Sequence, residues 1–209
     1  MNSGLLLPCA LGLFLISTTA LAGPNPNFRL PLHVVESFWA PCEDYLPVDC
    51  LGTRPATAAI PNHPAVIYLL VFNHTGIAGL QAGLEWDPSW TWSFALFDCL
   101  PGQLEGIFPD GPTTASGSTA FNCLQGPALA AIGRITFQVG HSGCLKFRQP
   151  AYTLGIAALA CTSLEVDQIT DADSPRLGRV CVGSGGHDPC DAAVPVEPST
   201  WGEIKSTFR

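Results

Sequence analysis

Charged side chains are scarce in this sequence. Only 12% of its 209 residues are Asp, Glu, Lys or Arg, about half of the usual share. Basic residues are the rarest, with 9 Lys and Arg against 17 Asp and Glu, and the formal net charge is −8. Nucleic acids and anionic membranes attract basic surfaces, which so acidic a chain does not provide. The composition therefore argues against both kinds of partner.

Long apolar runs are missing as well. The longest, residues 5–16, has about a dozen residues, whereas a membrane-spanning helix needs about 20. It is followed by Ala20-Leu21-Ala22, which places small residues at the two positions that a signal peptidase recognises. We expect residues 1–22 to be a signal peptide cleaved after Ala22. The mature chain is then secreted, extracellular or periplasmic, with no membrane span.

The Cys-x-x-Cys pairs of zinc sites are also absent, although the chain has nine cysteines. Cys9 lies in the expected signal, so eight cysteines remain, and an even number in an exported chain predicts a disulfide framework. Eight cysteines allow 105 pairings, and the entropy of loop closure favours neighbours along the chain. On that ground we expect the bonds Cys42–Cys50, Cys99–Cys123, Cys144–Cys161 and Cys181–Cys190.

Turn-forming residues are abundant, with 21 glycines and 19 prolines, and no segment of the mature chain shows a sustained helical period. Several segments instead have the apolar runs or the two-residue alternation of strands. Their spacing predicts an all-β protein with an antiparallel β-sandwich fold. We expect residues 98–118 to be irregular, and strands at residues 33–39, 65–72, 81–86, 90–97, 129–139, 144–148, 152–156 and 179–182.

The chain divides into four segments on this interpretation. The expected signal is followed by an extended segment with a long loop, then by the sandwich domain, and finally by a tail rich in glycine and proline. The strand at residues 33–39 can belong to the sandwich although it precedes the long loop. The boundaries that we expect are residues 1–22, 23–64, 65–183 and 184–209.

The tail ends in a pattern that predicts a short helix. Thr200 and Glu203 have the spacing of a capping box, and Trp201, Ile204 and Phe208 would then share one helical face. So short a helix is marginal alone. It either docks on the sandwich and covers a sheet edge or acts as a recognition tag for export or surface attachment.

Two internal segments and the tail carry a resemblance to known proteins. Residues 77–88, IAGLQAGLEWDP, and residues 133–139, GRITFQV, resemble strands of cohesin-like β-sandwiches of the carbohydrate-binding superfamily. Residues 200–205, TWGEIK, are similar to a TWGxIK-type tail of uncharacterised exported bacterial proteins with such a sandwich. The resemblance implies a cohesin-like or jelly-roll-like fold and a bacterial source. Because cohesins bind dockerins, it also implies an interaction module with a protein partner.

The tryptophans of the expected strand at residues 90–97 allow two interpretations. Trp90 and Trp92 are two residues apart and share one strand face, and Trp86 lies just before the turn. Exposed rings of this kind hold sugars in many β-sandwich modules. Phe94 and Leu96 continue the same face, however, which favours an inward face filled with core side chains. We prefer the core interpretation and keep sugar binding as the alternative function.

One acidic segment has the ligand types that calcium prefers. It places four carboxylates within nine residues, and hard oxygen ligands suit this ion. The glycine and the final glutamate of an EF-hand loop are missing, so a solvated acidic turn is the preferred interpretation and no cofactor is expected. The calcium candidates are Glu165, Asp167, Asp171 and Asp173.

Signals for catalysis are weak. The sequence has no Gly-x-Ser-x-Gly motif, and its five histidines are scattered singly. Nothing in the spacing selects a pair of carboxylates for glycoside hydrolysis, although two pairs can be formed. We therefore expect a non-catalytic interaction or structural module that binds an extracellular protein or glycan, with a secreted hydrolase as the third hypothesis. The two carboxylate pairs are Glu85 with Asp87 and Asp98 with Glu105.

Overall fold

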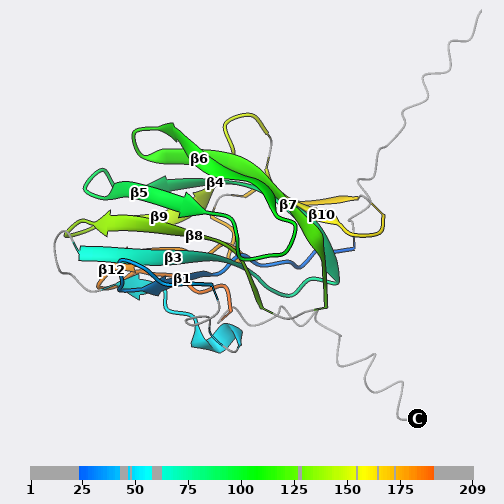
Figure 1. Cartoon of the computed structure of the whole chain (residues 1–209), viewed down its shortest axis with the longest axis horizontal. Helices are drawn as coiled ribbons and strands as arrows, with labels where there is room; N and C mark the ends of the chain where they lie inside the picture. The colour runs from blue at the N-terminus through cyan, green and yellow to red at the C-terminus, as the bar shows by residue number, and fades with distance from the viewer. Residues whose placement is uncertain are drawn as a thin grey trace, which may run out of the picture.

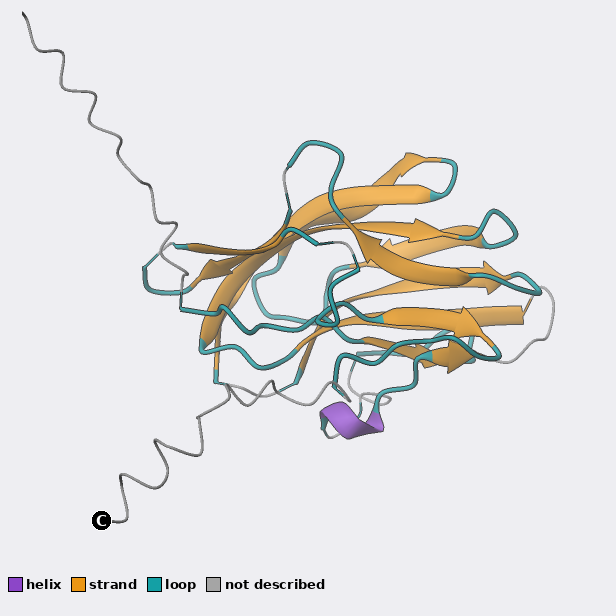
Figure 2. Cartoon of the chain, turned by 180° about the vertical axis from the view of Figure 1, so that it is seen from behind, coloured by secondary structure: helices purple, strands orange, loops and turns teal. Residues whose placement is uncertain are grey.

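The computed structural model describes residues 24–42, 47, 49–57, 63–126, 129–153, 155–163, 165–171 and 173–190. The expected signal peptide and the expected helix after Thr200 lie outside these residues. In the described part the chain is almost entirely β-structure, arranged as two facing sheets (Figure 1). Its one described helix is the single 3₁₀ turn Cys50–Gly52, which lies outside the strands (Figure 2). None of the described helical residues forms a segment long and apolar enough to cross a bilayer.

The smaller sheet has four antiparallel strands. The long apolar strand β3 lies in its interior, between β1 and β8, and β5 pairs with the far edge of β8. The bounds are β1 (Leu32–Val35), β3 (His63–Val71), β8 (Ala130–Val139) and β5 (Thr91–Leu96).

The larger sheet has eight strands and is organised around β4 (Gly76–Trp86). One edge of β4 pairs with β7, which in turn pairs with β6. Its other edge pairs first with β10 and then with β9, so that β11, β12 and β2 complete the sheet. The bounds are β2 (Ala56–Thr57), β6 (Leu104–Gly111), β7 (Thr114–Gln125), β9 (Cys144–Arg148), β10 (Ile156–Ala160), β11 (Val166–Ile169) and β12 (Arg179–Val182).

The main core lies between the two sheets. Alternate residues of each strand point inward, as the period of two requires: Ile67 and Leu69 from β3 meet Leu80, Ala82 and Leu84 from β4. Each large apolar side chain that is fully buried in this way stabilises the fold by about 1.5–3 kcal/mol. The antiparallel β-sandwich predicted from the sequence is therefore confirmed.

Strand β3 is buried on both faces, as its continuous apolar sequence predicts. On the outer face of the four-stranded sheet, Val66, Tyr68 and Leu70 form a second apolar cluster with Ala40 and Ala131. The Tyr68 hydroxyl lies 2.9 Å from the Ala40 carbonyl oxygen. The segment after β1 thus covers this part of the sheet.

Four disulfides connect the eight mature cysteines, and all four expected pairings are wrong. Chain proximity proved a poor guide because loop-closure entropy grows slowly, by about 0.6 kcal/mol per doubling of the loop, while sheet pairing decides which strands become neighbours. Cys144 and Cys181, for example, lie directly opposite each other on β9 and β12. The structure contains Cys42–Cys99, Cys50–Cys190, Cys123–Cys161 and Cys144–Cys181, in place of Cys42–Cys50, Cys99–Cys123, Cys144–Cys161 and Cys181–Cys190.

Two predictions about single strands are also wrong. Residues 98–118 are not irregular, since they contain β6 and the start of β7. Strand β6 forms in spite of Pro109 because it pairs only with β7 and a sheet edge tolerates a missing N–H donor. Of the expected strand at residues 152–156, Tyr152, Thr153 and Gly155 lie in turns or bends, and β10 begins only at Ile156.

A bulge in β5 changes which side chains face the core. The register with β8 shifts between Trp92 and Phe94, and a bulge reverses the alternation of faces beyond it. Ala95 and Phe97 therefore pack against the main core. The prediction that Phe94 and Leu96 continue the inward face of Trp92 is wrong for this reason.

Candidate binding surface

The three tryptophans considered for sugar binding lie at the main core. Trp90 is 2% exposed, and its indole Nε1 donates a hydrogen bond of 2.8 Å to the Ser142 carbonyl oxygen. Trp86 is also buried, and Trp92 is half-buried with its ring 5.3 Å from that of Trp86. All three rings contact Phe137 between the sheets. They consequently fill the interior and offer no flat outer platform for a sugar.

The four acidic residues considered for calcium do not converge. Asp167 points inward and is buried, and one of its oxygens accepts a 2.6 Å hydrogen bond from the backbone N–H of Asn25. Asp171 accepts a hydrogen bond from the backbone N–H of Asp173, and Glu165 is exposed. In the described part of the chain, no three of these carboxylates come within 4.8 Å of one another.

The carboxylates considered for hydrolysis have other partners. Glu85 lies 3.8 Å from Lys146, and Asp98 lies 3.2 Å from Arg134. Hydrogen bonds from the side chain and backbone of Ser89 hold the pKa of Asp87 below its usual value. A general acid needs the opposite shift. Glu105 accepts a hydrogen bond from a serine hydroxyl, so nothing sets these groups apart as a catalytic pair.

A histidine and a hydroxyl group do come together, at Thr57 and His63. The Thr57 Oγ1 lies 2.8 Å from His63 Nε2 and 3.3 Å from a carboxylate oxygen of Glu36. Only 3% of Thr57 is exposed, so its hydroxyl cannot meet a substrate as a nucleophile. The contact instead ties the short strand β2 to the neighbouring β1 and β3.

The outer face of the larger sheet carries a shallow hollow, which we call the apolar trough. Five residues in register cross five adjacent strands, from β11 through β10, β4 and β7 to β6. The residues at the two ends are apolar and exposed, and two of the three residues between them are small. The hollow has a volume of about 260 Å³. The row consists of Val166, Leu159, Gly79, Ala120 and Leu104, and all of these except Leu104 line the hollow.

The trough is nearly free of charge. Glu105 is the charged residue at its wall, and the Ser118 hydroxyl donates a 3.0 Å hydrogen bond to its carboxylate. Gly79 forms part of the floor, where an added Cβ atom would lie only 3.2 Å from the Thr119 carbonyl oxygen. The surface can therefore bury apolar groups of a partner, with one acidic group at the wall.

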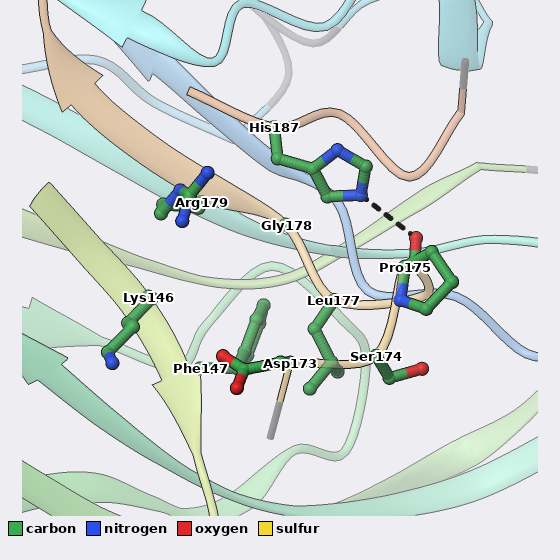
Figure 3. A pocket seen from close by; sticks show the side chains of 9 residues that line it. All are labelled: Lys146, Phe147, Asp173, Ser174, Pro175, Leu177, Gly178, Arg179 and His187. Carbon is green, nitrogen blue, oxygen red and sulfur yellow. Dashed lines mark hydrogen bonds between the residues drawn. The ribbon is translucent and has the colours of Figure 1, made fainter. Parts of the chain in front are cut away.

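A second hollow, the polar pocket, is lined by nine residues that include Lys146, Asp173, Arg179 and His187 (Figure 3). It has a volume of about 240 Å³ and is bounded by β9, β12 and the loop that precedes β12. Lys146 and Arg179 lie on its strand side, and Asp173 and His187 come from the loops around it. Basic and acidic groups thus meet in one hollow.

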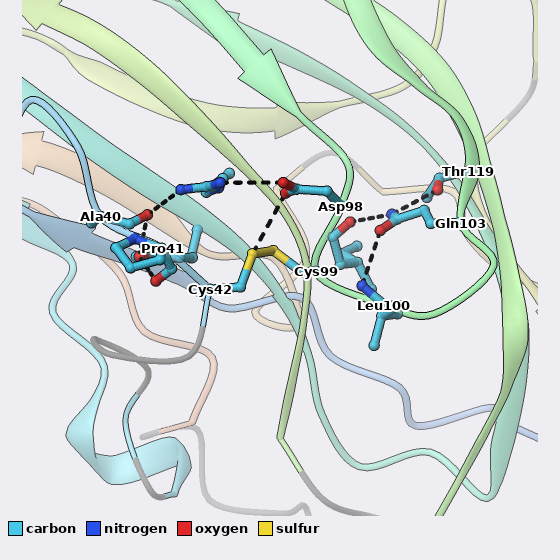
Figure 4. Close-up of a disulfide and its surroundings, with 11 residues drawn as sticks. Ala40, Pro41, Cys42, Asp98, Cys99, Leu100, Gln103 and Thr119 are labelled. Atoms are coloured by element: carbon cyan, nitrogen blue, oxygen red, sulfur yellow. Dashed lines mark hydrogen bonds and ion pairs between the residues drawn. A yellow bond between two sulfur atoms is a disulfide. The ribbon is translucent and has the colours of Figure 1, made fainter.

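An exposed aromatic group, missed in the sequence, lies beside the outer cluster of the four-stranded sheet. Trp39 is 55% exposed, and its ring lies 6.3 Å from that of Phe94. The guanidinium of Arg134, which belongs to β8, lies 4.6 Å from the centre of the Trp39 ring. The Cys42–Cys99 bond fixes this region, with Asp98 and Ala40 around it (Figure 4). Residues 33–39 were expected to be one strand, and its early end at Val35 leaves Trp39 outside the sheet.

These features define a β-sandwich of two facing sheets that carries four disulfides. The chain is similar in structure to the sixth cohesin of scaffoldin B from Acetivibrio cellulolyticus, solved in complex with a Cel5 dockerin, with a TM-score of 0.48 and 8% identity over 74% of this chain and 96% of that one. It is also similar to a cohesin module of a family 33 glycoside hydrolase from Clostridium perfringens, with a TM-score of 0.46 and 6% identity over 74% and 95% of the two chains.

A third similar structure is a non-cellulosomal cohesin from the archaeon Archaeoglobus fulgidus, with a TM-score of 0.47 and 10% identity over 75% of this chain and 92% of that one. Comparisons with protein-family models and with curated proteins found no match. Identities this low and TM-scores below 0.5 describe a likeness in general architecture only. The function has to be inferred from the surfaces of the chain itself.

Proposed function

We propose that this chain is an exported, non-catalytic module that binds a partner protein through the apolar trough. The observation that carries the proposal is the row across five strands, in which the small residues Gly79 and Ala120 lie between apolar side chains at both ends. Leu104 is 66% exposed and Val166 is 48% exposed. Four disulfides support an extracellular or periplasmic location, because such bonds persist in oxidising compartments.

The dimensions of the trough fit an amphipathic helix of the partner. Five strands span four spacings of about 4.8 Å each, or roughly 19 Å. A helix rises about 1.5 Å per residue, so about 13 residues lie along this length. Gly79 and Ala120 line the trough and allow close approach. A helix laid along the whole row would also cover Val166 at one end and Leu104, which is in register with Ala120 beside the hollow, at the other. Each of these two side chains contributes up to about 1.5–3 kcal/mol when buried.

The chemistry of the wall also limits the partner. Because Glu105 is the charged group there, a basic residue on the helix improves the fit and a second acidic residue weakens it. The alternative function, sugar binding through Trp90 and Trp92, lacks a support of this kind because these rings pack in the core.

The experiment tests the trough with two matched variants. The oxidised protein, residues 23–209, is immobilised and exposed to the other exported proteins of the producing organism, and each retained protein is purified and its Kd measured. Ala120→Arg fills the trough with a long charged side chain. Thr91→Arg adds the same side chain to an exposed position of β5, on the other sheet.

We expect the Ala120→Arg variant to lose at least 100-fold in affinity and Thr91→Arg to bind like the wild type. Both variants should keep the melting temperature of the wild type, because both positions are exposed. A partner that binds Ala120→Arg normally would contradict the role of the trough. Specific glycan binding without any protein partner would contradict the proposed function itself.

A further inference from the structure

The polar pocket contains a repulsive arrangement of two cations. Lys146 on β9 and Arg179 on β12 lie directly opposite each other in the register of the larger sheet. Both point outward, because the next residues along the strands, Leu145 and Val180, are buried in the core. Like charges in directly opposed positions destabilise a sheet. A chain with only nine Lys and Arg and a net charge of −8 nevertheless places two of them here.

Neighbouring groups compensate the two cations unequally. Lys146 lies 3.8 Å from Glu85 on β4. Among the described residues, the Arg179 guanidinium makes one hydrogen bond, which its Nε donates to the Gly185 carbonyl oxygen at 3.0 Å. Its two terminal nitrogens therefore retain the paired donors that bind a carboxylate in a bidentate manner.

The opposite rim of the pocket presents acceptors and hydroxyl groups. Asp173 and Ser174 line the pocket opposite Lys146 (Figure 3). His187 is held by a 3.0 Å contact between its Nε2 and the Pro175 carbonyl oxygen. The floor is apolar, with Phe147 and Leu177 both buried. A simple inorganic anion would pair with the cations but would face the carboxylate of Asp173 with nothing to donate.

We propose that the polar pocket binds a hexuronic acid residue, free or as part of an acidic glycan. Its carboxylate pairs with Arg179 and Lys146, its hydroxyls donate to Asp173, and the C–H face of its ring lies over Leu177. The cavity of about 240 Å³ is below the roughly 300–1,000 Å³ of drug-sized sites, as one sugar ring requires. The site shares no residue with the apolar trough, so it stands or falls independently of the proposed function.

The first test compares probes that differ in one group. Galacturonate and galactose are titrated into the oxidised protein and followed by NMR chemical shifts, with oligogalacturonate as a third probe. We expect galacturonate to shift the signals of Arg179 and Lys146 and to bind at least 10-fold more tightly than galactose. Binding should weaken with added salt, since the rim is exposed. Binding of the monomer indicates a free sugar as ligand, whereas binding of the oligomer alone indicates a glycan; either supports the site.

The second test separates a uronate site from a general anion site. Arg179→Gln should weaken the binding of galacturonate at least 10-fold. Arg54→Gln makes the same change of charge at an exposed position outside the pocket and should leave the affinity unchanged. Asp173→Asn removes a negative charge from the rim. This substitution should weaken the binding of galacturonate, because the sugar hydroxyls lose their acceptor. It should strengthen the binding of acetate, which has no hydroxyl to donate.

Three results would overturn the proposal. Equal binding of galactose and galacturonate would show that the carboxylate is not recognised. Tighter binding of galacturonate to Asp173→Asn would show a simple anion site, and an unchanged affinity in Arg179→Gln would exclude the guanidinium as the ligand-binding group. Folding of each variant is verified by its melting temperature, and all substituted side chains are exposed or half-exposed.

Discussion

Arg134 shows how single residues of this chain combine burial with charge. It is 6% exposed although it carries a positive charge. The Ala40 carbonyl oxygen accepts a 2.6 Å hydrogen bond from one guanidinium nitrogen, and Asp98 lies 3.2 Å from another. Trp39 covers the guanidinium from outside, at 4.6 Å from its ring centre. The exposed Trp39 ring thus stabilises the fold. A cation–π contact is stronger when the cation is shielded from water, as Arg134 is here.

Replacement of Trp90 by alanine tests the core assignment of the tryptophans. The change removes a buried ring and leaves the Ser142 carbonyl oxygen without its indole donor. We expect a loss of about 3–5 kcal/mol in the free energy of unfolding, measured by urea denaturation. Trp39→Ala, at an exposed position, should cost about 1–2 kcal/mol. A Trp90→Ala protein as stable as the wild type would contradict the core assignment.

Asp110 links stability to pH. Partial burial alone would raise its pKa, but hydrogen bonds from Ser116 and Thr114, together with the Arg148 guanidinium at 2.7 Å, hold the pKa below the ordinary value of 3.8. A carboxylate with a lowered folded-state pKa stabilises the protein above its unfolded-state pKa. This contribution is lost as the pH falls through the lowered value.

Because Asp110 is exposed and water screens its pair with Arg148, we expect Asp110→Asn to cost about 1 kcal/mol near neutral pH and progressively less below pH 3.8. The free energies of unfolding of both proteins, compared by urea denaturation across this range, check the sign. Glu85→Gln breaks the exposed pair with Lys146 and serves as control, with a cost below about 1 kcal/mol. A cost for Asp110→Asn that does not shrink in acid would refute the linkage.

At the scale of elements, local sequence predicts strands well where their side chains are consistently apolar or alternate. The expected strands at residues 144–148 and 179–182 match β9 and β12. Strand β6 escaped prediction because Gly106, Pro109 and Gly111 interrupt its pattern, and its formation depends on pairing with β7. The bulge in β5 is likewise a consequence of pairing, since its register shift shows only against β8.

The pairing of β6 with β7 depends on a glycine. Gly117 lies opposite Ile107, and a Cβ atom added to Gly117 would lie 2.0 Å from the Gly106 carbonyl oxygen. We expect Gly117→Ala to force the two strands apart and to cost about 1–3 kcal/mol. Hydrogen exchange should show the loss of protection in β6 and β7 before the rest of the sheet. Uniform protection in the variant would contradict this local effect.

At the scale of the whole molecule, the candidate sites were less predictable than the fold. The row from Val166 to Leu104 includes Gly79 and so joins five strands spread over more than eighty residues of sequence, and no local pattern connects its members. Lys146 and Arg179 become neighbours only through the register of β9 with β12. The disulfides follow the same rule. The sequence predicted that the cysteines would pair, but their partners depend on the order of strands in the sheets.

The bond between Cys50 and Cys190 should stabilise the molecule strongly, because it closes a loop with a sequence separation of 140 residues. Constraint of the unfolded chain by so long a loop is worth up to about 5 kcal/mol. We expect the double variant Cys50→Ala/Cys190→Ala to lose about 2–5 kcal/mol in urea denaturation under oxidising conditions. The variant Cys144→Ala/Cys181→Ala, with a separation of 37 residues, should lose about 1 kcal/mol less. The reverse order of stability would contradict the entropic explanation.

The same bond has a mechanical consequence. Residues 191–209 follow Cys190 in the sequence, so tension transmitted along the chain from the C-terminal side reaches the described residues at this cysteine. The covalent link passes the tension to Cys50 before it reaches β12. Hydrogen bonds between β12 and β9 are thereby spared the peeling load that separates strands one bond at a time. A partner or surface that holds the tail can then strain the connection without unravelling the sheet that forms the polar pocket.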